Sequence, residues 1–103
     1  MGKYNSEYKP TQEEFEKEYP VDFGLGVRGR WYSSKGIDHA GIIIAHFHPD
    51  KLLCCVAVSI TEPNNRGAQW TRVCEEPLTL TPSILDTSCG LNGHITNGKW
   101  VPC

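Results

Sequence analysis

The sequence has 103 residues, of which 39% are hydrophobic and 21% are charged. This length suits a single domain, and the balance of apolar and charged residues excludes wholesale disorder and collagen-like repeats. The chain is too short for a Rossmann or barrel enzyme with a separate substrate domain. A formal net charge of −2 argues against a broad basic surface for nucleic acid.

The negative charge is concentrated near the N-terminus. Residues 1–20 hold three lysines and five glutamates, whereas residues 21–103 hold seven charges of each sign. We therefore expect an acidic N-terminal arm with a short helix over residues 1–20, followed by a single β-rich domain over residues 21–103. The pattern favours a solvated helix face over an acidic docking arm.

The compartment expected from the sequence is the cytoplasm. No apolar secretory segment is visible, and the longest apolar run, Leu52–Val58, is far shorter than the ~20 residues that span a bilayer. We expect no membrane contact. The five cysteines include no C-x-x-C pair, and in a reducing compartment they are expected to be thiols or metal ligands rather than a disulfide framework.

A short helix is predicted from Thr11 to Glu18. Thr11 and Glu14 have the spacing of a capping box, in which the two side chains bond the first free backbone amides of a helix. Pro20 ends the helix because proline disfavours the helical conformation in the residue before it. A helix this short is marginal alone, so its apolar side is expected to dock on the rest of the chain.

All of the chain after Pro20 is predicted to be β structure. The consecutive isoleucines Ile42–Ile44 indicate a strand buried on both faces, and the turn at Pro49–Lys51 makes an antiparallel hairpin with the next apolar strand. Pro82 excludes a central, paired position for its own segment. The predicted strands are Val27–Ser33, Ala40–His48, Leu52–Ile60 and Gln69–Val73, with an extended segment over Pro77–Ile84.

The clearest local signal is Asn97-Gly98. This pair accepts the positive φ angles of a type I′ turn and would join two short strands, Gly93–Thr96 and Lys99–Val101. Gly24-Leu25-Gly26 lacks the strand–helix setting of a phosphate-binding loop, so we predict a flexible bend there. The resulting fold class is mainly β (α+β): a small antiparallel sheet or half-barrel with one short N-terminal helix.

His46 and His48 lie two residues apart in a predicted strand. Because side chains alternate along a strand, both imidazoles point to the same face and can chelate one metal ion. Cys89 and His94 lie on either side of the turn that leads into the last hairpin, and they would complete a mixed nitrogen and sulfur set for Zn²⁺. The alternative is that both strand histidines face solvent while Phe47 points inward.

Asp50, Cys55 and Cys103 are the alternative metal ligands. The H-x-H-x-D pattern that runs from His46 to Asp50 occurs in binuclear metal-dependent hydrolases, where the metals generate a hydroxide nucleophile. Such enzymes need several further His and Asp ligands, of which this chain has few. Cys54 and Cys55 face opposite sides of a strand, so at least one of them is expected to be a small core residue.

Three segments carry a resemblance to a known family. They are residues 38–45 (DHAGIIIA), residues 77–84 (PLTLTPSI) and residues 89–98 (CGLNGHITNG). In combination, over about residues 37–102, they resemble a family of small phage and bacterial proteins of unknown function, some of whose members carry an "ammonia monooxygenase" label. The resemblance covers most of the predicted β domain.

The resemblance implies a zinc site. In that family a Cys-x-Cys-type cluster ends the first strand, and His46 and His48 stand at its place here. Cys89 matches the later cysteine of the family. The family's histidine falls nearest Asn92, where this chain instead offers His94. Zn²⁺ accepts imidazole as readily as thiolate, so the resemblance implies a site with exchanged ligand types.

The expected function is protein interaction rather than catalysis. The resemblance implies no established reaction, and related bacterial domains accompany ubiquitin-like conjugation systems. We therefore expect a phage-type cytosolic interaction module, stabilised by one structural Zn²⁺, that binds and inhibits a host defence protein. Trp31, Trp70 and Trp100 are expected to serve the core or a contact face. The alternatives are a small metal-dependent hydrolase and a homodimer paired through an exposed edge strand.

Overall fold

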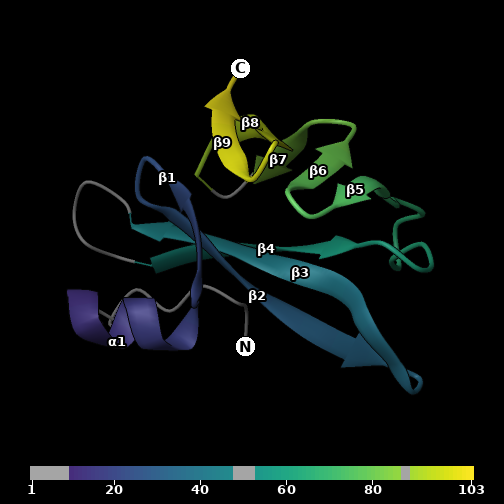
Figure 1. Cartoon of the computed structure of the whole chain (residues 1–103), viewed down its shortest axis with the longest axis horizontal. Helices are drawn as coiled ribbons and strands as arrows, with labels where there is room; N and C mark the ends of the chain where they lie inside the picture. The colour runs from purple at the N-terminus through teal and green to yellow at the C-terminus, as the bar shows by residue number, and fades with distance from the viewer. Residues whose placement is uncertain (1–9, 48–52, 87–88) are drawn as a thin grey trace.

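The computed structural model describes residues 10–47, 53–86 and 89–103, which form one short helix and a set of antiparallel strands. The elements are α1 (Gln12–Glu18), β1 (Val21–Gly24), β2 (Val27–Ser34), β3 (Ile37–Phe47), β4 (Leu53–Ser59), β5 (Thr71–Glu75), β6 (Leu78–Thr81), β7 (Ile84–Asp86), β8 (Leu91–Thr96) and β9 (Lys99–Pro102). The β1–β4 sheet lies in the middle. The helix packs on one of its faces, and the β5–β6 and β7–β9 sheets pack on the other (Figure 1).

Three of the hairpins turn through a pair of residues with positive φ angles. Leu25-Gly26 joins β1 to β2, Lys35-Gly36 joins β2 to β3, and Asn97-Gly98 joins β8 to β9; both φ angles are positive in each pair. Such pairs match the twist of the flanking strands, and glycine removes the steric cost at the second position. The type I′ turn predicted at Asn97-Gly98 is confirmed. The bend predicted at Gly24–Gly26 is the turn of the β1–β2 hairpin, while its flexibility stays a prediction.

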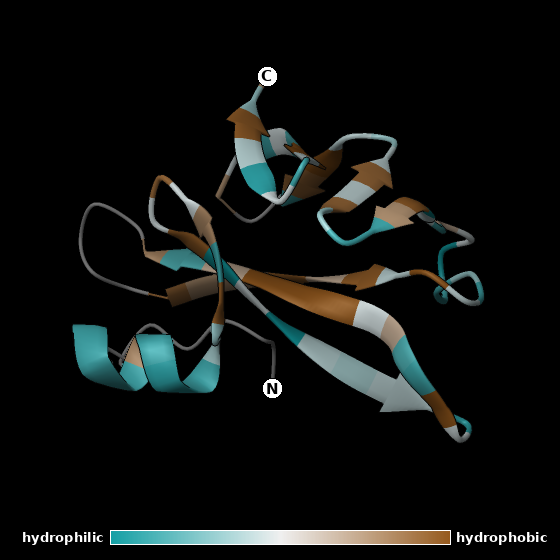
Figure 2. Cartoon of the chain, in the orientation of Figure 1, coloured by the Kyte–Doolittle hydropathy of each residue, from teal (hydrophilic) through white to brown (hydrophobic). Residues whose placement is uncertain are grey.

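Strand β3 contributes to a core on each of its faces because its side chains alternate. Ile42 and Ile44 are fully buried on the side of the smaller sheets, while Ile43 packs on the helix side. The strand buried on both faces is thereby confirmed, and its apolar colour between the layers is visible in Figure 2. The larger core joins buried residues of all three sheets: Phe23, Val27, Ile42, Ile44, Val58, Ile60, Leu78, Leu80, Ile84, Ile95 and Trp100.

The helix docks through one apolar side. At its start, Thr11 Oγ1 accepts the Glu14 N–H at 3.1 Å, and Glu14 Oε1 accepts the Thr11 N–H at 2.8 Å. Phe15 and Tyr19 are buried against apolar residues of β3 and β4, Ala45 among them. Most of the remaining helix surface is hydrophilic (Figure 2). The predicted capping box and the docking of the helix are both confirmed.

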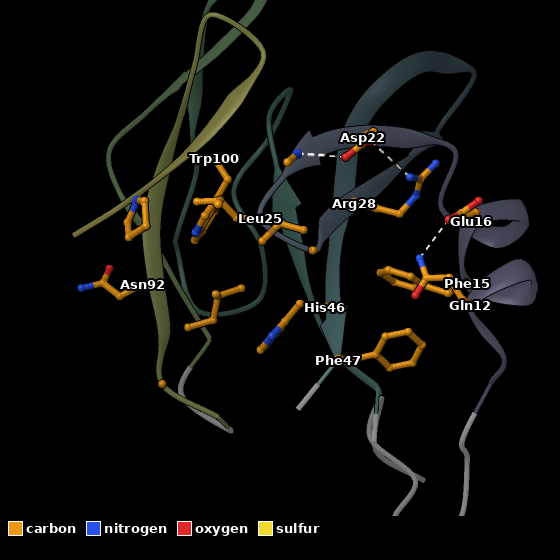
Figure 3. Close-up of a pocket in the computed structure, with 16 residues that line it drawn as sticks. Gln12, Phe15, Glu16, Asp22, Leu25, Arg28, His46, Phe47, Asn92 and Trp100 are labelled. Carbon is orange, nitrogen blue, oxygen red and sulfur yellow. Dashed lines mark hydrogen bonds and ion pairs between the residues drawn. The ribbon is translucent and has the colours of Figure 1, made fainter. Parts of the chain in front are cut away.

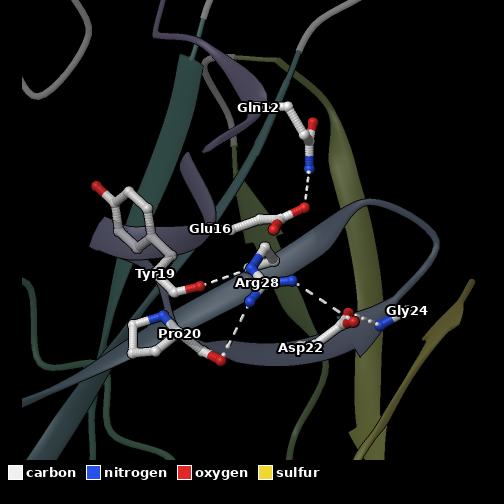
Figure 4. A network of polar contacts seen from close by, with 7 residues as sticks. All are labelled: Gln12, Glu16, Tyr19, Pro20, Asp22, Gly24 and Arg28. Carbon is white, nitrogen blue, oxygen red and sulfur yellow. Dashed lines mark hydrogen bonds and ion pairs between the residues drawn. The ribbon is translucent and has the colours of Figure 1, made fainter. Parts of the chain in front are cut away.

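Arg28 fixes the connection between α1 and β1. Its Nε donates to the Tyr19 carbonyl at 2.6 Å, and its Nη2 donates to the Pro20 carbonyl at 3.2 Å (Figure 4). Its Nη1 lies 3.5 Å from Asp22 Oδ2, while Asp22 Oδ1 accepts the Gly24 N–H at 2.9 Å. One guanidinium on β2 therefore holds two backbone carbonyls and a carboxylate of the segment that leaves the helix.

The mainly β fold class is confirmed, and the antiparallel sheets of the described residues do not close into a barrel. The predicted strands are present with shifted ends, and the extended segment Pro77–Ile84 contains β6 and the start of β7. The short edge strand β1 was not predicted. None of the helical structure in the described ranges is long and apolar enough to cross a membrane. The division at residue 20 stays a prediction, and residues 1–9 lie outside the described residues.

Candidate metal centre

Two residues of the centre come from the β3–β4 hairpin. His46 and Cys54 are direct cross-strand partners in its antiparallel register. Strand alternation places His46 on the same face of β3 as Ile42 and Ile44, which line the core between the sheets. Both side chains therefore point from the end of the middle sheet toward the β7–β9 sheet.

The other two residues come from the facing sheet. Asp86 is the last residue of β7, and Cys89 lies in the turn that leads into β8. The Asp86 carbonyl accepts the Cys89 N–H at 3.2 Å and the Gly90 N–H at 2.7 Å. This turn reverses the chain so that the carboxylate and the thiol approach the same point.

The four side chains offer one ligand atom each, and these atoms all lie within 4.8 Å of one another. His46 Nε2 is 2.9 Å from Cys89 Sγ. Cys54 and Asp86 are each only 1% exposed, while His46 and Cys89 are half-buried. One imidazole nitrogen, two thiol sulfurs and one carboxylate oxygen form a donor set that zinc accepts in tetrahedral geometry. The cluster could therefore hold a metal ion.

The environment of Cys89 opposes ionisation of its thiol. Burial is the largest cause that raises the pKa of Cys89 to about 12, and a hydrogen bond with the Cys54 thiol and the negative charge of Asp86 act in the same direction. A backbone hydrogen bond from Leu91 acts in the opposite direction. Without a cation the thiol is thus kept neutral, whereas a bound metal ion would stabilise the thiolate.

The structure brings together two of the four ligands predicted from the sequence, His46 and Cys89. His94 is not in this group: its neighbours Gly93 and Ile95 are buried, so alternation turns His94 to the other face of β8, where its Nδ1 lies 3.7 Å from Cys103 Sγ. That contact also places the alternative ligand Cys103 outside the group.

Of the remaining predicted ligands, one lies on the opposite side of the middle sheet and two lie outside the described residues. Cys55 points to the helix side of the middle sheet and packs with the core cluster that contains Phe15. His48 and Asp50 lie outside the described residues. Only His46 and Phe47 of the H-x-H-x-D pattern are among the described residues, so the arrangement of its three candidate ligands stays a prediction.

Sequence reasoning missed Cys54 and Asp86 as members of the group. For Cys54 a signal was present: a hairpin whose turn is centred near residue 50 pairs residue 46 with residue 54, so Cys54 shares the face of His46. For Asp86 the local sequence offers no comparable signal. Its place in the group depends on how the β7–β9 sheet packs against the middle sheet.

A cavity of about 620 Å³ opens beside the candidate centre, between α1, the β1–β2 turn, the end of β3 and the β8–β9 hairpin (Figure 3). His46 lines it together with apolar side chains, including Phe15, Phe47, Leu91 and Trp100. The imidazole therefore lies between this cavity and the three other members of the group.

The three tryptophans lie in or against the larger core. Trp100 is buried within it, and Trp31 and Trp70 are half-buried and pack against it. Trp70 also donates its indole N–H to the Ser83 carbonyl at 3.2 Å. The structure thus gives each of them a packing role, and none of the three is fully exposed.

Comparison of the chain with protein families, curated proteins and solved structures finds no match. The resemblance to a family of small phage and bacterial proteins therefore stays an expectation.

Proposed function

We propose that this protein is a small β interaction module whose two sheet layers are joined by one structural Zn²⁺. The observation that carries the proposal is the origin of the four donors. His46 and Cys54 belong to the middle sheet, whereas Asp86 and Cys89 belong to the strand and turn that face it. An ion held by all four residues would link the two layers at one end of the core, where it adds its binding free energy to folding.

The donor count supports a structural rather than a catalytic ion. Structural zinc sites are closed by four protein ligands, while catalytic sites keep one position for water or substrate. Four donors already converge here. An ion bound by all of them would have no open position for chemistry, so we propose that the protein acts through contacts. A host protein as the partner, and a defence protein in particular, stays a prediction.

The metal-dependent hydrolase remains the second candidate because His46 lines the 620 Å³ cavity. Catalysis there would require one of the other three donors to leave the ion and admit water from the cavity side. A Co²⁺-substituted protein separates the two proposals. Four-coordinate absorption that is unchanged by azide would support the structural ion, and a spectrum that shifts with azide would support an open position.

The direct test is a calorimetric titration of metal-free, reduced protein with Zn²⁺. We expect one ion per chain, and we expect Cys54→Ser to weaken binding at least tenfold, about 1.4 kcal/mol. His94→Ala is the matched control, because this histidine faces away from the group and its variant should bind as the parent does. Loss of binding in His94→Ala with full binding in Cys54→Ser would refute the ligand set.

A further inference from the structure

Two of the four members of the candidate centre are thiols that lie next to each other. The sulfur atoms of Cys54 and Cys89 lie within 4.8 Å of each other. Cys54 lies on β4 and Cys89 in the turn before β8. A bond between these two sulfurs would therefore connect the same two layers that we propose the metal ion connects.

The other cysteines are placed away from this pair. Cys55 points to the opposite side of the middle sheet and packs against the helix layer. Cys74 is exposed on β5, and Cys103 is exposed beside His94 at the end of the chain. All five are thiols in this structure. Of the five cysteines, the fold thus brings Cys54 and Cys89 together. It also places Cys55, the neighbour of Cys54 in the sequence, on the opposite side of the sheet.

We propose that Cys54 and Cys89 form an oxidation site: in the metal-free protein they are converted to a disulfide by a small-molecule disulfide, and a bound metal ion prevents this. The exclusion by metal rests on the proposed function, whereas the pairing of the thiols does not. Each sulfur can serve either as a metal ligand or as half of a disulfide, so the two states compete for the same atoms.

The chemistry is a double thiol–disulfide exchange. Cys89 reacts first because it is half-buried, whereas Cys54 is only 1% exposed. The surroundings of Cys89 disfavour a free thiolate, so the proton must leave during the attack: His46 Nε2, 2.9 Å from Cys89 Sγ, accepts it as the Cys89 sulfur attacks one sulfur of the small disulfide. A mixed disulfide forms, and the departing thiolate takes up that proton. The Cys54 thiol then gives its proton to the second departing thiolate as its sulfur attacks Cys89. The two protein thiols are oxidised, and one small disulfide is reduced to two thiols.

The experiment uses two matched triple variants of the full chain. Cys55→Ser/Cys74→Ser/Cys103→Ser keeps the proposed pair, and Cys54→Ser/Cys74→Ser/Cys103→Ser keeps Cys55 with Cys89. Both are treated in metal-free form with 2-hydroxyethyl disulfide, a small uncharged oxidant. Intact-mass spectrometry follows the loss of two hydrogen atoms per chain. The first variant is expected to form the intramolecular disulfide at least tenfold faster than the second.

The native chain provides an independent readout if a variant does not fold. After oxidation and tryptic digestion, the expected cross-link joins the peptide of residues 52–66 to the peptide of residues 73–99, and fragmentation of the linked peptides assigns it to Cys54 and Cys89 rather than to Cys55 or Cys74. Zn²⁺ added beforehand is expected to slow this cross-link at least tenfold. Equal rates in the two folded variants, or a native cross-link that involves Cys103 instead, would overturn the proposed pairing.

The outcomes separate this inference from the proposed function. If the Cys54–Cys89 disulfide forms but Zn²⁺ neither binds nor slows it, the thiol pairing stands and the structural ion is rejected. If Zn²⁺ binds with one ion per chain but the metal-free protein forms no such disulfide, the oxidation site is rejected and the structural ion stands. If Zn²⁺ binds but does not slow the formation of the Cys54–Cys89 disulfide, the claim that metal binding and the disulfide exclude each other is overturned.

Discussion

Asp86 is the one buried acidic residue in the part of the chain that the structure describes, at 1% exposure. Burial of a carboxylate is costly unless a partner or a cation compensates its charge. Its negative charge also raises the pKa of the neighbouring Cys89 thiol, after the larger effect of burial. A cation held by the four side chains would compensate the charge of Asp86, so we expect this charge to matter more for metal binding than for the stability of the metal-free protein.

This difference predicts the behaviour of Asp86→Asn. The amide keeps the shape of the side chain but removes its charge, so the metal-free protein should lose little stability, within about 1 kcal/mol. Zinc affinity should fall at least tenfold, about 1.4 kcal/mol. Urea unfolding in chelator and a calorimetric Zn²⁺ titration measure the two effects. A variant that binds Zn²⁺ like the parent would show that Asp86 is not a ligand.

The raised pKa of Cys89 predicts that the free energy of unfolding of the metal-free protein changes with pH in the alkaline range. Burial raises the pKa of Cys89 from 9.0 to about 12, so the folded state favours the protonated thiol more than the unfolded state does. This contribution is complete below pH 9 and is lost as the pH rises toward 12. We expect the free energy of unfolding to fall over that window, and to fall less in Cys89→Ser.

The measurement is urea unfolding between pH 8 and 11, with a chelator and a reductant present and tryptophan fluorescence as the signal. Tyrosines and lysines also titrate in this range, but they do so in both proteins, so the difference between the parent and Cys89→Ser isolates the thiol. Parallel pH profiles for the two proteins would contradict the raised pKa.

At the scale of the elements, Arg28 makes several polar contacts with the segment that connects the helix to the sheet. Arg28 is largely buried, with 16% of its side chain exposed, and it holds the carbonyls of Tyr19 and Pro20 together with Asp22. Hydrogen bonds that involve a charged group are worth more than neutral ones, and of the two carbonyls that Arg28 binds, that of Tyr19 belongs to a buried residue. The short helix thus depends on β2 for its position as well as on the core below it.

We expect Arg28→Ala to lower the free energy of unfolding by about 2–3 kcal/mol. Arg30→Ala is the matched control: Arg30 lies two residues along the same strand, its side chain is 44% exposed, its Nη1 lies 3.7 Å from Glu18 Oε2, and its guanidinium lies 5.3 Å from the centre of the Tyr19 ring without bonding a backbone carbonyl among the described residues. Arg30→Ala should cost about 1 kcal/mol, less than Arg28→Ala, because exposed ion pairs and exposed cation–π contacts contribute little. Equal losses in urea unfolding of the two variants would show that the contacts in Figure 4 do not anchor the helix.

At the scale of the molecule, the two sheet layers meet through one apolar core, and the candidate centre lies at one end of it. In Figure 1 the middle sheet lies between the helix and strands β5–β9, and each of its faces has its own core cluster. A cross-link between β4 and the turn before β8 would therefore act on the whole assembly of layers. Loss of this cross-link should lower the free energy of unfolding of the entire domain rather than loosen one hairpin.

We accordingly expect a chelator to lower the melting temperature of the zinc-loaded protein. At free zinc one hundred times the dissociation constant, the ion contributes about 2.7 kcal/mol, which corresponds to roughly 10–20 °C in a domain of this size. Differential scanning calorimetry with and without chelator measures the shift. The His46→Ala variant should have the same melting temperature with and without chelator. If the parent protein also has the same melting temperature with and without chelator, a structural ion is excluded.

The local elements of this fold follow from short stretches of sequence. Thr11 and Glu14 specify the start of the helix, Asn97-Gly98 specifies the last hairpin, and the isoleucines of β3 indicate a strand between two layers. Each of these depends on backbone preferences or on side-chain alternation over a few residues. The strand β1 was missed because it has only four residues and gains its partner from β2.

The sequence by itself identified His46 and Cys89 as candidate ligands and indicated that strand alternation separates Cys54 from Cys55. The tertiary structure decided that Asp86 and Cys54 join them and that His94 does not, because side chains from two sheets must first be brought face to face. Alternation along a strand is a local property that can be read along the chain. The distance between residues on different sheets depends on how the whole core packs, and no short segment contains that information.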